Sequence, residues 1–206
     1  MFRKLTILIL CGLLFLRVDA QKFDGGFTLG ISTSQVGGDN LAGFHKAGLL
    51  IGIFANKNIS EILRIQMEIN YIQKGSNNPD INNYDHPNYL KQDISLAYIE
   101  IPLLVQYKIK DKLKIEAGNF IAFLNNGYYN DLNGEIPYNT NPFIDYDVGL
   151  IIGVDYHFLE HISLNTRFSN SIIPIGAEDY KNQNTYNTLN KGKYNSVLSF
   201  SLHYNF

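Results

Sequence analysis

The side chains of this sequence that could do chemistry are ionisable groups set at every second position of alternating segments. Arg64 and Glu68 are separated by an even number of positions in residues 63–71, and so are Asp147 and Asp155 in residues 144–158. A spacing of two puts side chains on one face of a β-strand. Such groups could pair across facing strands, or line a narrow ion path or proton relay. The full set is Arg64, Glu68, Glu100, Lys114, Glu116, Asp147, Asp155 and Arg167.

Hydrolytic chemistry would need a histidine beside a nucleophile and a carboxylate. The five histidines are His45, His86, His157, His161 and His203. The sequence has no Gly-x-Ser-x-Gly elbow, no His–Ser–Asp grouping and no metal-ligand spacing. We therefore expect the histidines to be polar surface residues, and the sequence predicts no catalytic residue, no metal site and no cofactor. A hydrolase sited at a membrane rim is kept as a third alternative.

Tyrosines and asparagines gather in long polar segments, chiefly residues 74–93, 125–142 and 174–193. Tyr and Asn suit adaptable binding surfaces, but they are also ordinary in solvated loops. Both interpretations remain open for the tyrosines in these segments. They are Tyr84, Tyr89, Tyr128, Tyr129, Tyr138, Tyr180 and Tyr186.

The elements that must position these groups are β-strands, because apolar residues recur with period two and no helical period follows residue 20. About eight strands are predicted, most of them reaching the nine to eleven residues that a tilted strand needs to cross a bilayer. They cover residues 23–33, 47–55, 63–71, 95–109, 113–123, 143–158, 161–172 and 195–206.

The connections alternate in length along the chain. Residues 55–60, 108–113 and 157–162 form tight turns, whereas the connections between them are long and rich in Asn, Tyr, Gly and Pro. Short and long connections therefore project from opposite ends of one up-and-down meander. The sequence shows neither a linker nor a second domain.

The first residues read as an export signal. Arg3 and Lys4 precede an apolar run over residues 5–16, and Ala20 is a small residue at the expected cleavage point. The run is too short to span a membrane as a helix. We expect a signal peptide over residues 1–20 and a barrel domain over residues 21–206. The single cysteine, Cys11, lies in the signal, so no disulfide is expected afterwards.

Alternation does not say whether the apolar face points inward, as in a soluble lipocalin-like barrel, or outward to lipid. The export signal, the asymmetric connections, the charges on the polar face and the aromatic residues near strand ends favour lipid. The predicted fold is all-β, an eight-stranded antiparallel up-and-down transmembrane β-barrel. Its interior is just wide enough for side chains, so we expect the inward charges to pair there and no wide pore to form. Neutralising Arg64 is expected to destabilise the fold before it opens a channel.

The last strand, "VLSFSLHYNF", resembles the terminal signature that the barrel-insertion machinery reads in outer-membrane barrels, with Leu202, Tyr204 and Phe206 as its apolar positions. The stretches "YIEIPLLVQYKI", "KIEAGNFIAFL" and "YDVGLIIGVDYHF" resemble the PorT-type outer-membrane β-barrel family of Bacteroidota. This resemblance implies an outer-membrane location. Some relatives serve the type IX secretion system, and many have no assigned role.

The expected function is a non-enzymatic structural, adhesive or partner-binding role through long extracellular loops. The alternative is a component or accessory of a protein-export apparatus. Expected partners are outer-membrane lipid, the barrel-insertion machinery and an extracellular or export partner, with the chain a monomer. A net charge of −2 gives no basic footprint for nucleic acid.

Overall fold

The computed structural model describes residues 23–38, 43–77, 93–131, 134–136, 143–176 and 192–206. Most of these residues lie in β-strands, as the period-two alternation predicts. The strands are β1 (Asp24–Gly37), β2 (Lys46–Asn58), β3 (Leu63–Asn77), β4 (Asp93–Lys110), β5 (Leu113–Asp131), β6 (Gly134–Ile136), β7 (Tyr146–His157), β8 (Ile162–Ser171) and β9 (Tyr194–Asn205).

The strands form one closed antiparallel barrel. The sheet order is β4-β3-β2-β1-β9-β8-β7-β5, and a further pairing between β4 and β5 closes it. The short β6 pairs only with the far end of β5, outside the closed wall. The barrel therefore has eight strands, which confirms the predicted fold class. Closure matters because an open sheet edge would leave backbone groups without partners in lipid.

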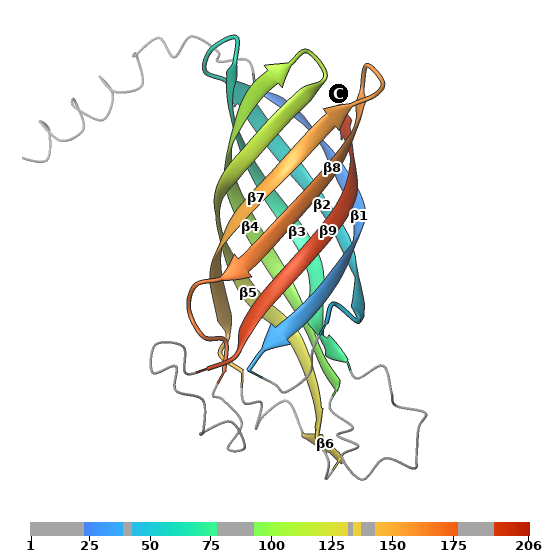
Figure 1. The fold of residues 1–206 in the computed structure, drawn as a ribbon, viewed down its shortest axis with the longest axis vertical. Coiled ribbons are helices and arrows are strands. Elements are labelled where there is room, and N and C mark those ends of the chain that lie inside the picture. The colour runs from blue at the N-terminus through green and yellow to red at the C-terminus, as the bar shows by residue number, and fades with distance from the viewer. Residues whose placement is uncertain (1–22, 39–42, 78–92, 132–133, 137–142, 177–191) are drawn as a thin grey trace, which may run out of the picture.

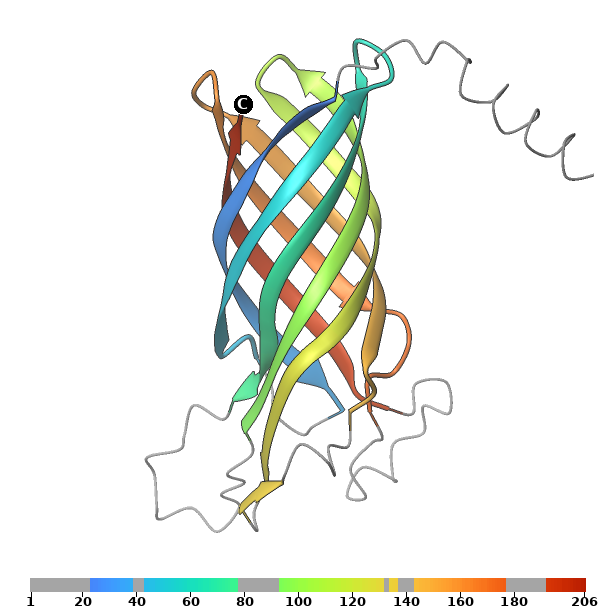
Figure 2. The same ribbon diagram turned by 180° about the vertical axis from the view of Figure 1, so that it is seen from behind.

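The two ends of the barrel differ (Figures 1 and 2). The hairpins β2–β3, β4–β5 and β7–β8 and the C-terminus share one end, which we call the turn end. The strand ends that the longer connections join, together with β6, lie at the other, which we call the loop end. The predicted alternation of short and long connections is thus confirmed.

The apolar face of the wall points outward. Leu150 on β7 keeps 55% of its surface exposed and Leu202 on β9 keeps 48%. Their inward neighbours Asp147 and Ser201 are buried. This arrangement confirms the predicted face assignment and rules out the lipocalin-like alternative, in which the apolar residues would line the interior.

The first and last strands meet to close the wall. β1 pairs with β9 from Gly26 opposite Asn205 to Gly37 opposite Tyr194. The Phe206 N–H donates to the Gly25 carbonyl at 3.0 Å, and its ring meets the Phe27 ring edge-on with centroids 5.1 Å apart. The final residues are thus a wall strand rather than a frayed tail.

Several strands run further toward the loop end than predicted. β3 continues to Asn77 and β5 to Asp131, through residues that the sequence indicated as loops. At about 3.3 Å per residue, β5 is roughly twice as long as one bilayer crossing requires. Pairing with β4 and β6 holds this part of β5, so backbone hydrogen bonding continues where the sequence pattern weakens.

The interior is not filled by polar groups alone, which corrects the sequence-based expectation. Its loop half contains an apolar cluster in which Leu104, Phe120 and Ile151 pack among other buried side chains. We call this the apolar cluster. Its members are Val36, Leu50, Ile72, Ile94, Leu96, Tyr98, Leu104, Phe120, Ala122, Tyr129, Phe143, Ile151, Ile175 and Val197.

Candidate functional site in the barrel lumen

Three side chains from separate strands form a buried cluster in the lumen, which we call the Arg167 cluster. Arg167 on β8 donates from Nη1 and Nη2 to the two carboxylate oxygens of Glu68 on β3, each at 2.7 Å. Its Nε donates to Glu116 on β5. A bidentate guanidinium–carboxylate pair fixes geometry as well as charge. The cluster therefore links β3, β5 and β8 across the interior.

Neutral amides complete this cluster. Glu68 also accepts from Gln66 at 2.6 Å and from Asn70 at 2.8 Å. Glu116 also accepts from Asn165 and from Gln106, each at 2.9 Å. Two carboxylates face one guanidinium, so these amide donors supply the hydrogen bonds that the second carboxylate requires when it is buried.

A second cluster, which we call the Lys74 cluster, lies nearer the loop end. The ammonium of Lys74 on β3 pairs with Glu100 on β4 and lies 3.5 Å from Asp147 on β7. It also sits 4.3 Å from the centre of the Phe120 ring. Cation–π contact with a desolvated ring adds to the ion pairs. Lys74 is thus held by both the polar and the apolar parts of the lumen.

Asp155 belongs to a third group near the turn end. It accepts a hydrogen bond from Ser163 at 2.8 Å and lies 2.8 Å from Nδ1 of His157. His203 is buried beside it, with Nδ1 3.7 Å from Asp155 and Nε2 3.3 Å from Ser201 Oγ. The structure therefore corrects two expectations, because His203 is not a surface residue and a Ser–His–Asp grouping does exist.

That grouping lacks the geometry of a hydrolase. The 3.7 Å gap between His203 and Asp155 is too long for an orienting hydrogen bond. Ser201 and His203 are both buried, and neither lines the pocket at the turn end.

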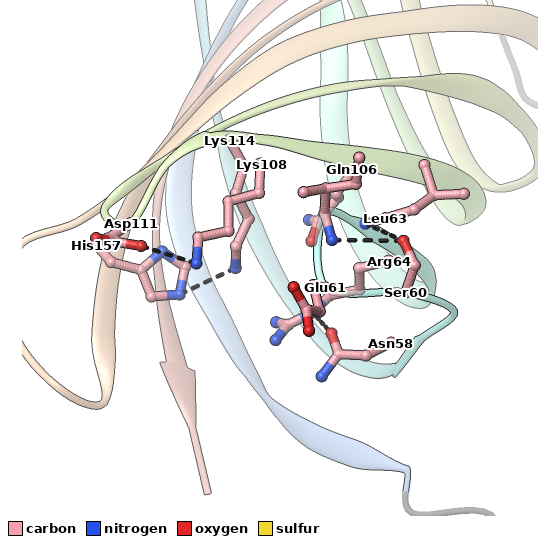
Figure 3. Close-up of a pocket in the computed structure, with 11 residues that line it drawn as sticks. Asn58, Ser60, Glu61, Leu63, Arg64, Gln106, Lys108, Asp111, Lys114 and His157 are labelled. Atoms are coloured by element: carbon pink, nitrogen blue, oxygen red, sulfur yellow. Dashed lines mark hydrogen bonds and ion pairs between the residues drawn. The ribbon is translucent and has the colours of Figure 1, made fainter.

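The turn end of the lumen opens into a pocket of about 540 Å³ (Figure 3). Arg64 on β3, Gln106 and Lys108 on β4, Lys114 on β5 and His157 on β7 line it. The remaining lining residues are Asn58, Ser60, Glu61, Ile62, Leu63 and Asp111. Figure 3 shows Arg64 and Lys114 reaching into the same space from separate strands.

Two of the cations at this mouth differ in their partners. Lys108 pairs with Asp111 in the β4–β5 turn at 2.9 Å, and this ion-paired hydrogen bond lowers the pKa of the Asp111 carboxyl. Arg64 donates from Nε to Asn58 at 2.7 Å, and no carboxylate among the described residues forms an ion pair with it. Only Lys108 therefore has its charge neutralised at short range.

The predicted set of inward charges thus divides between several places. Arg167, Glu68 and Glu116 meet in one cluster, whereas Glu100 and Asp147 meet around Lys74. Asp155 lies beside His157 and His203. Arg64 and Lys114 line the mouth of the lumen outside both clusters, because their strand positions are only one or two residues from the turns, and the expected ion pairing is not found for either of them among the described residues.

The tyrosines that were predicted to lie in loops fall into two groups. Tyr128 and Tyr129 lie on β5, not in a loop, and Tyr129 is buried against the Phe143 ring with centroids 5.8 Å apart. Tyr129 is therefore part of the apolar cluster and not of an open binding surface. The other predicted tyrosines, Tyr84, Tyr89, Tyr138, Tyr180 and Tyr186, lie outside the described residues.

Among the buried residues that the sequence analysis missed, Lys74 follows a sequence pattern that could have revealed it. Lys74 continues the inward parity of Arg64, Gln66, Glu68 and Asn70, so an extended period-two count along β3 would have found it. Phe120 and Leu104 carry no such signal, because both faces of their strands are apolar there.

The described residues contain no group of three or more His, Cys, Asp or Glu side chains that could hold a metal ion. In the same part of the chain, no helix has the length and hydropathy to cross a membrane.

The structure is a closed barrel with an outward apolar face and a filled interior, and known proteins share the barrel architecture. Residues 19–176 match the family described as outer membrane protein beta-barrel domain. The chain belongs to that family. It is accordingly an integral protein of the outer membrane. A search of curated proteins finds no match.

One solved structure supports the fold, and two others are similar at lower scores. The attachment invasion locus protein Ail of Yersinia pestis superposes with a TM-score of 0.51 at 8% identity, covering 90% of this chain and 99% of that one. Neisserial surface protein A gives a TM-score of 0.48 at 16% identity, with 89% and 97% covered. OprG of Pseudomonas aeruginosa gives 0.36 at 12%, with 89% and 94% covered. At these identities the likeness to Ail concerns the fold alone, and the two lower scores add no argument.

Proposed function

We propose that this outer-membrane barrel works through its surface, in a non-enzymatic structural, adhesive or partner-binding role carried by the connections at the loop end. The observation that supports this role is the filled interior. The Arg167 cluster, the Lys74 cluster and the apolar cluster are all buried, one after another along the lumen. A barrel with no free passage offers its partners only its wall and its two ends.

The loop end is the side proposed to face the cell exterior. Barrels of the outer membrane have short periplasmic turns and longer extracellular loops. Here β3 and β4 are separated by residues 78–92, whereas β4 and β5 are separated by two residues only. The turn end, where β1 begins and β9 ends, would then face the periplasm.

The route to the membrane is part of the same proposal. Residues 1–20 act as a signal peptide, and residues 21–206 are inserted as a monomer by the barrel-insertion machinery, which reads Leu202, Tyr204 and Phe206. All three side chains are exposed, Leu202 and Tyr204 on the outer wall of β9 and Phe206 directly after it. A machinery that binds this strand from the lipid side would meet them directly.

Surface labelling tests the orientation. The mature chain has no cysteine, so Tyr84→Cys between β3 and β4 and Asp111→Cys in the β4–β5 turn create single thiols. On intact cells, a maleimide reagent too large to cross the outer membrane should label Tyr84→Cys alone, and permeabilised cells should label both. Labelling of Asp111→Cys on intact cells would overturn the orientation, and with it the proposed role of the loops.

The second candidate is an accessory of a protein-export apparatus of the type IX kind. It is favoured by the resemblance of residues 98–109, 114–124 and 146–158 to the PorT-type family. Gentle solubilisation of native outer membranes separates the two candidates. Stoichiometric co-purification of export components would favour this one, and a lone monomer would favour the loop-based role.

A further inference from the structure

Two cations of the pocket at the turn end, Arg64 and Lys114, form no ion pair among the described residues, although the carboxylates of Glu61 and Asp111 also line this pocket. Arg64 lines the pocket and uses Nε for Asn58, which leaves both terminal nitrogens of its guanidinium without a hydrogen bond among the described residues. Lys114 lies 3.3 Å from Nε2 of His157, and no carboxylate among the described residues forms an ion pair with it.

Half-buried cations in one cavity favour an anion. Arg64 and Lys114 are each only partly exposed, and both point into the space that Figure 3 shows. Desolvated like charges repel, and an oxyanion between them removes that repulsion while accepting hydrogen bonds from both. The planar guanidinium fork suits a carboxylate or a phosphate oxygen pair. The cavity, at about 540 Å³, is within the usual size of a small-ligand site.

A third group at the inner wall of the pocket narrows the ligand class. Gln106 is 2% exposed, and its Nε2 donates to Glu116 at 2.9 Å and to Gln66 at 3.3 Å. Because a carboxylate can only accept, these contacts fix the orientation of the amide. Its Oε1 is buried and has no hydrogen-bond partner among the described residues. A buried acceptor of this kind needs an N–H or O–H donor.

We propose that this pocket binds the free carboxyl terminus of a short peptide. Arg64 and Lys114 hold the terminal carboxylate, and the buried Gln106 Oε1 turns toward the pocket to accept the amide N–H that lies a few bonds away from it. Lys108 is not required, because Asp111 already neutralises it. The chemistry rests on the pocket alone; that such a peptide would be periplasmic rests on the orientation proposed above.

Calorimetric titration of the folded protein in an uncharged detergent tests this proposal, with N-acetyl-alanyl-alanine as the probe. The free acid should bind saturably, and its C-terminal amide about tenfold more weakly, since one charge-assisted contact is lost. Equal affinity for acid and amide, or no saturable binding of the acid, would overturn the proposal. This comparison uses the unaltered chain and needs no variant.

Matched variants locate the site. Arg64→Gln and Lys114→Gln should each weaken binding of the acid about tenfold. Lys112→Gln removes an exposed cation from the β4–β5 turn outside the pocket, and binding should stay within about twofold because exposed charges are strongly screened. An equal loss in Lys112→Gln would mean general charge attraction and would overturn the site.

Inorganic phosphate distinguishes the peptide from any other oxyanion. Phosphate should compete about tenfold more weakly than the acid, because it cannot offer an N–H to Gln106. Phosphate that binds as tightly as the peptide acid would overturn the assignment of a peptide. Because these titrations do not depend on which side of the membrane the pocket faces, their failure is distinguishable from a failure of the surface-labelling test.

Discussion

At the scale of single residues, buried charge sets the energetics of the lumen. Arg167 holds two buried carboxylates that have no other cation in their cluster. Arg64 carries the same charge but lies at the mouth, half-buried and hydrogen-bonded to a neutral amide. Position along the strand, and not residue type, therefore decides what each arginine contributes.

Replacing Arg167 by Gln should lower the free energy of unfolding by about 3–5 kcal/mol, because Glu68 and Glu116 would remain buried without their cation. Denaturant titration in detergent, read as the heat-dependent shift in gel mobility, measures this loss. Arg64→Gln, the matched control, should cost less than about 1 kcal/mol. A larger loss in Arg64→Gln than in Arg167→Gln would restore the sequence-based expectation that neutralising Arg64 destabilises the fold.

Gly153 on β7 makes room for the same cluster. A Cβ there would lie 2.8 Å from Glu116 Oε1, 2.8 Å from the backbone carbonyl oxygen of Thr166 and 2.9 Å from Arg167 Cγ. Gly153→Ala should therefore destabilise the barrel by about 1–3 kcal/mol. Gly37→Ala on β1 is the control, since its nearest contact would be an ordinary 3.7 Å. Equal stability of the two alanine variants in the same gel assay would show that the cluster can shift without cost.

At the scale of the strands, each wall element separates a lipid face from a lumen face. Leu150→Arg would place a charge against lipid from β7, at a cost of about 2–4 kcal/mol near the bilayer midplane. Leu150→Phe keeps the position apolar and is the control. Refolding yields into lipid vesicles measure the effect, and unchanged yield for Leu150→Arg would mean that this part of β7 does not face lipid.

The last strand adds closure to this division. Phe206 packs against Phe27 of β1 and Tyr204 of its own strand. Phe206→Ala should reduce the folded fraction in outer membranes more than Tyr128→Ala, which removes an exposed ring from β5 beyond the expected bilayer. Comparing boiled and unboiled samples gives the folded fraction. Equal fractions for Phe206→Ala and the parent chain would contradict a role in closure.

At the scale of the whole molecule, period-two parity was sufficient to predict an antiparallel wall with one apolar and one polar face. The outward direction of the apolar face followed from the export signal, the asymmetric connections, the charges on the polar face and the aromatic residues near strand ends. Parity also put Glu68, Glu116 and Arg167 on the inward face. It could not predict which of them meet, because Arg167 and Glu68 are 99 residues apart and their contact depends on the tilt and register of the closed barrel. Nor could parity find Phe120 or Leu104, since an apolar residue between apolar neighbours shows no preferred face.

Conduction is the property that the whole barrel determines. A solute entering the pocket at the turn end meets Gln106 and then the Arg167 cluster, whose side chains are almost completely buried. Beyond it, the apolar cluster fills the loop half around Lys74. Ions would have to displace paired charges and then cross an apolar section, and both steps carry desolvation costs.

We therefore expect the folded protein to show no stable porin-sized conductance in planar bilayers and to admit no small sugars in liposome swelling. Phe120→Ala opens space in the apolar cluster but leaves the Arg167 cluster in place, so it should destabilise the barrel by about 3–5 kcal/mol without creating a channel. Single-channel recording on the parent and the variant checks both statements. A large, steady conductance of the parent chain would mean that the buried clusters separate in the membrane, and the proposed surface-based role would then give way to transport.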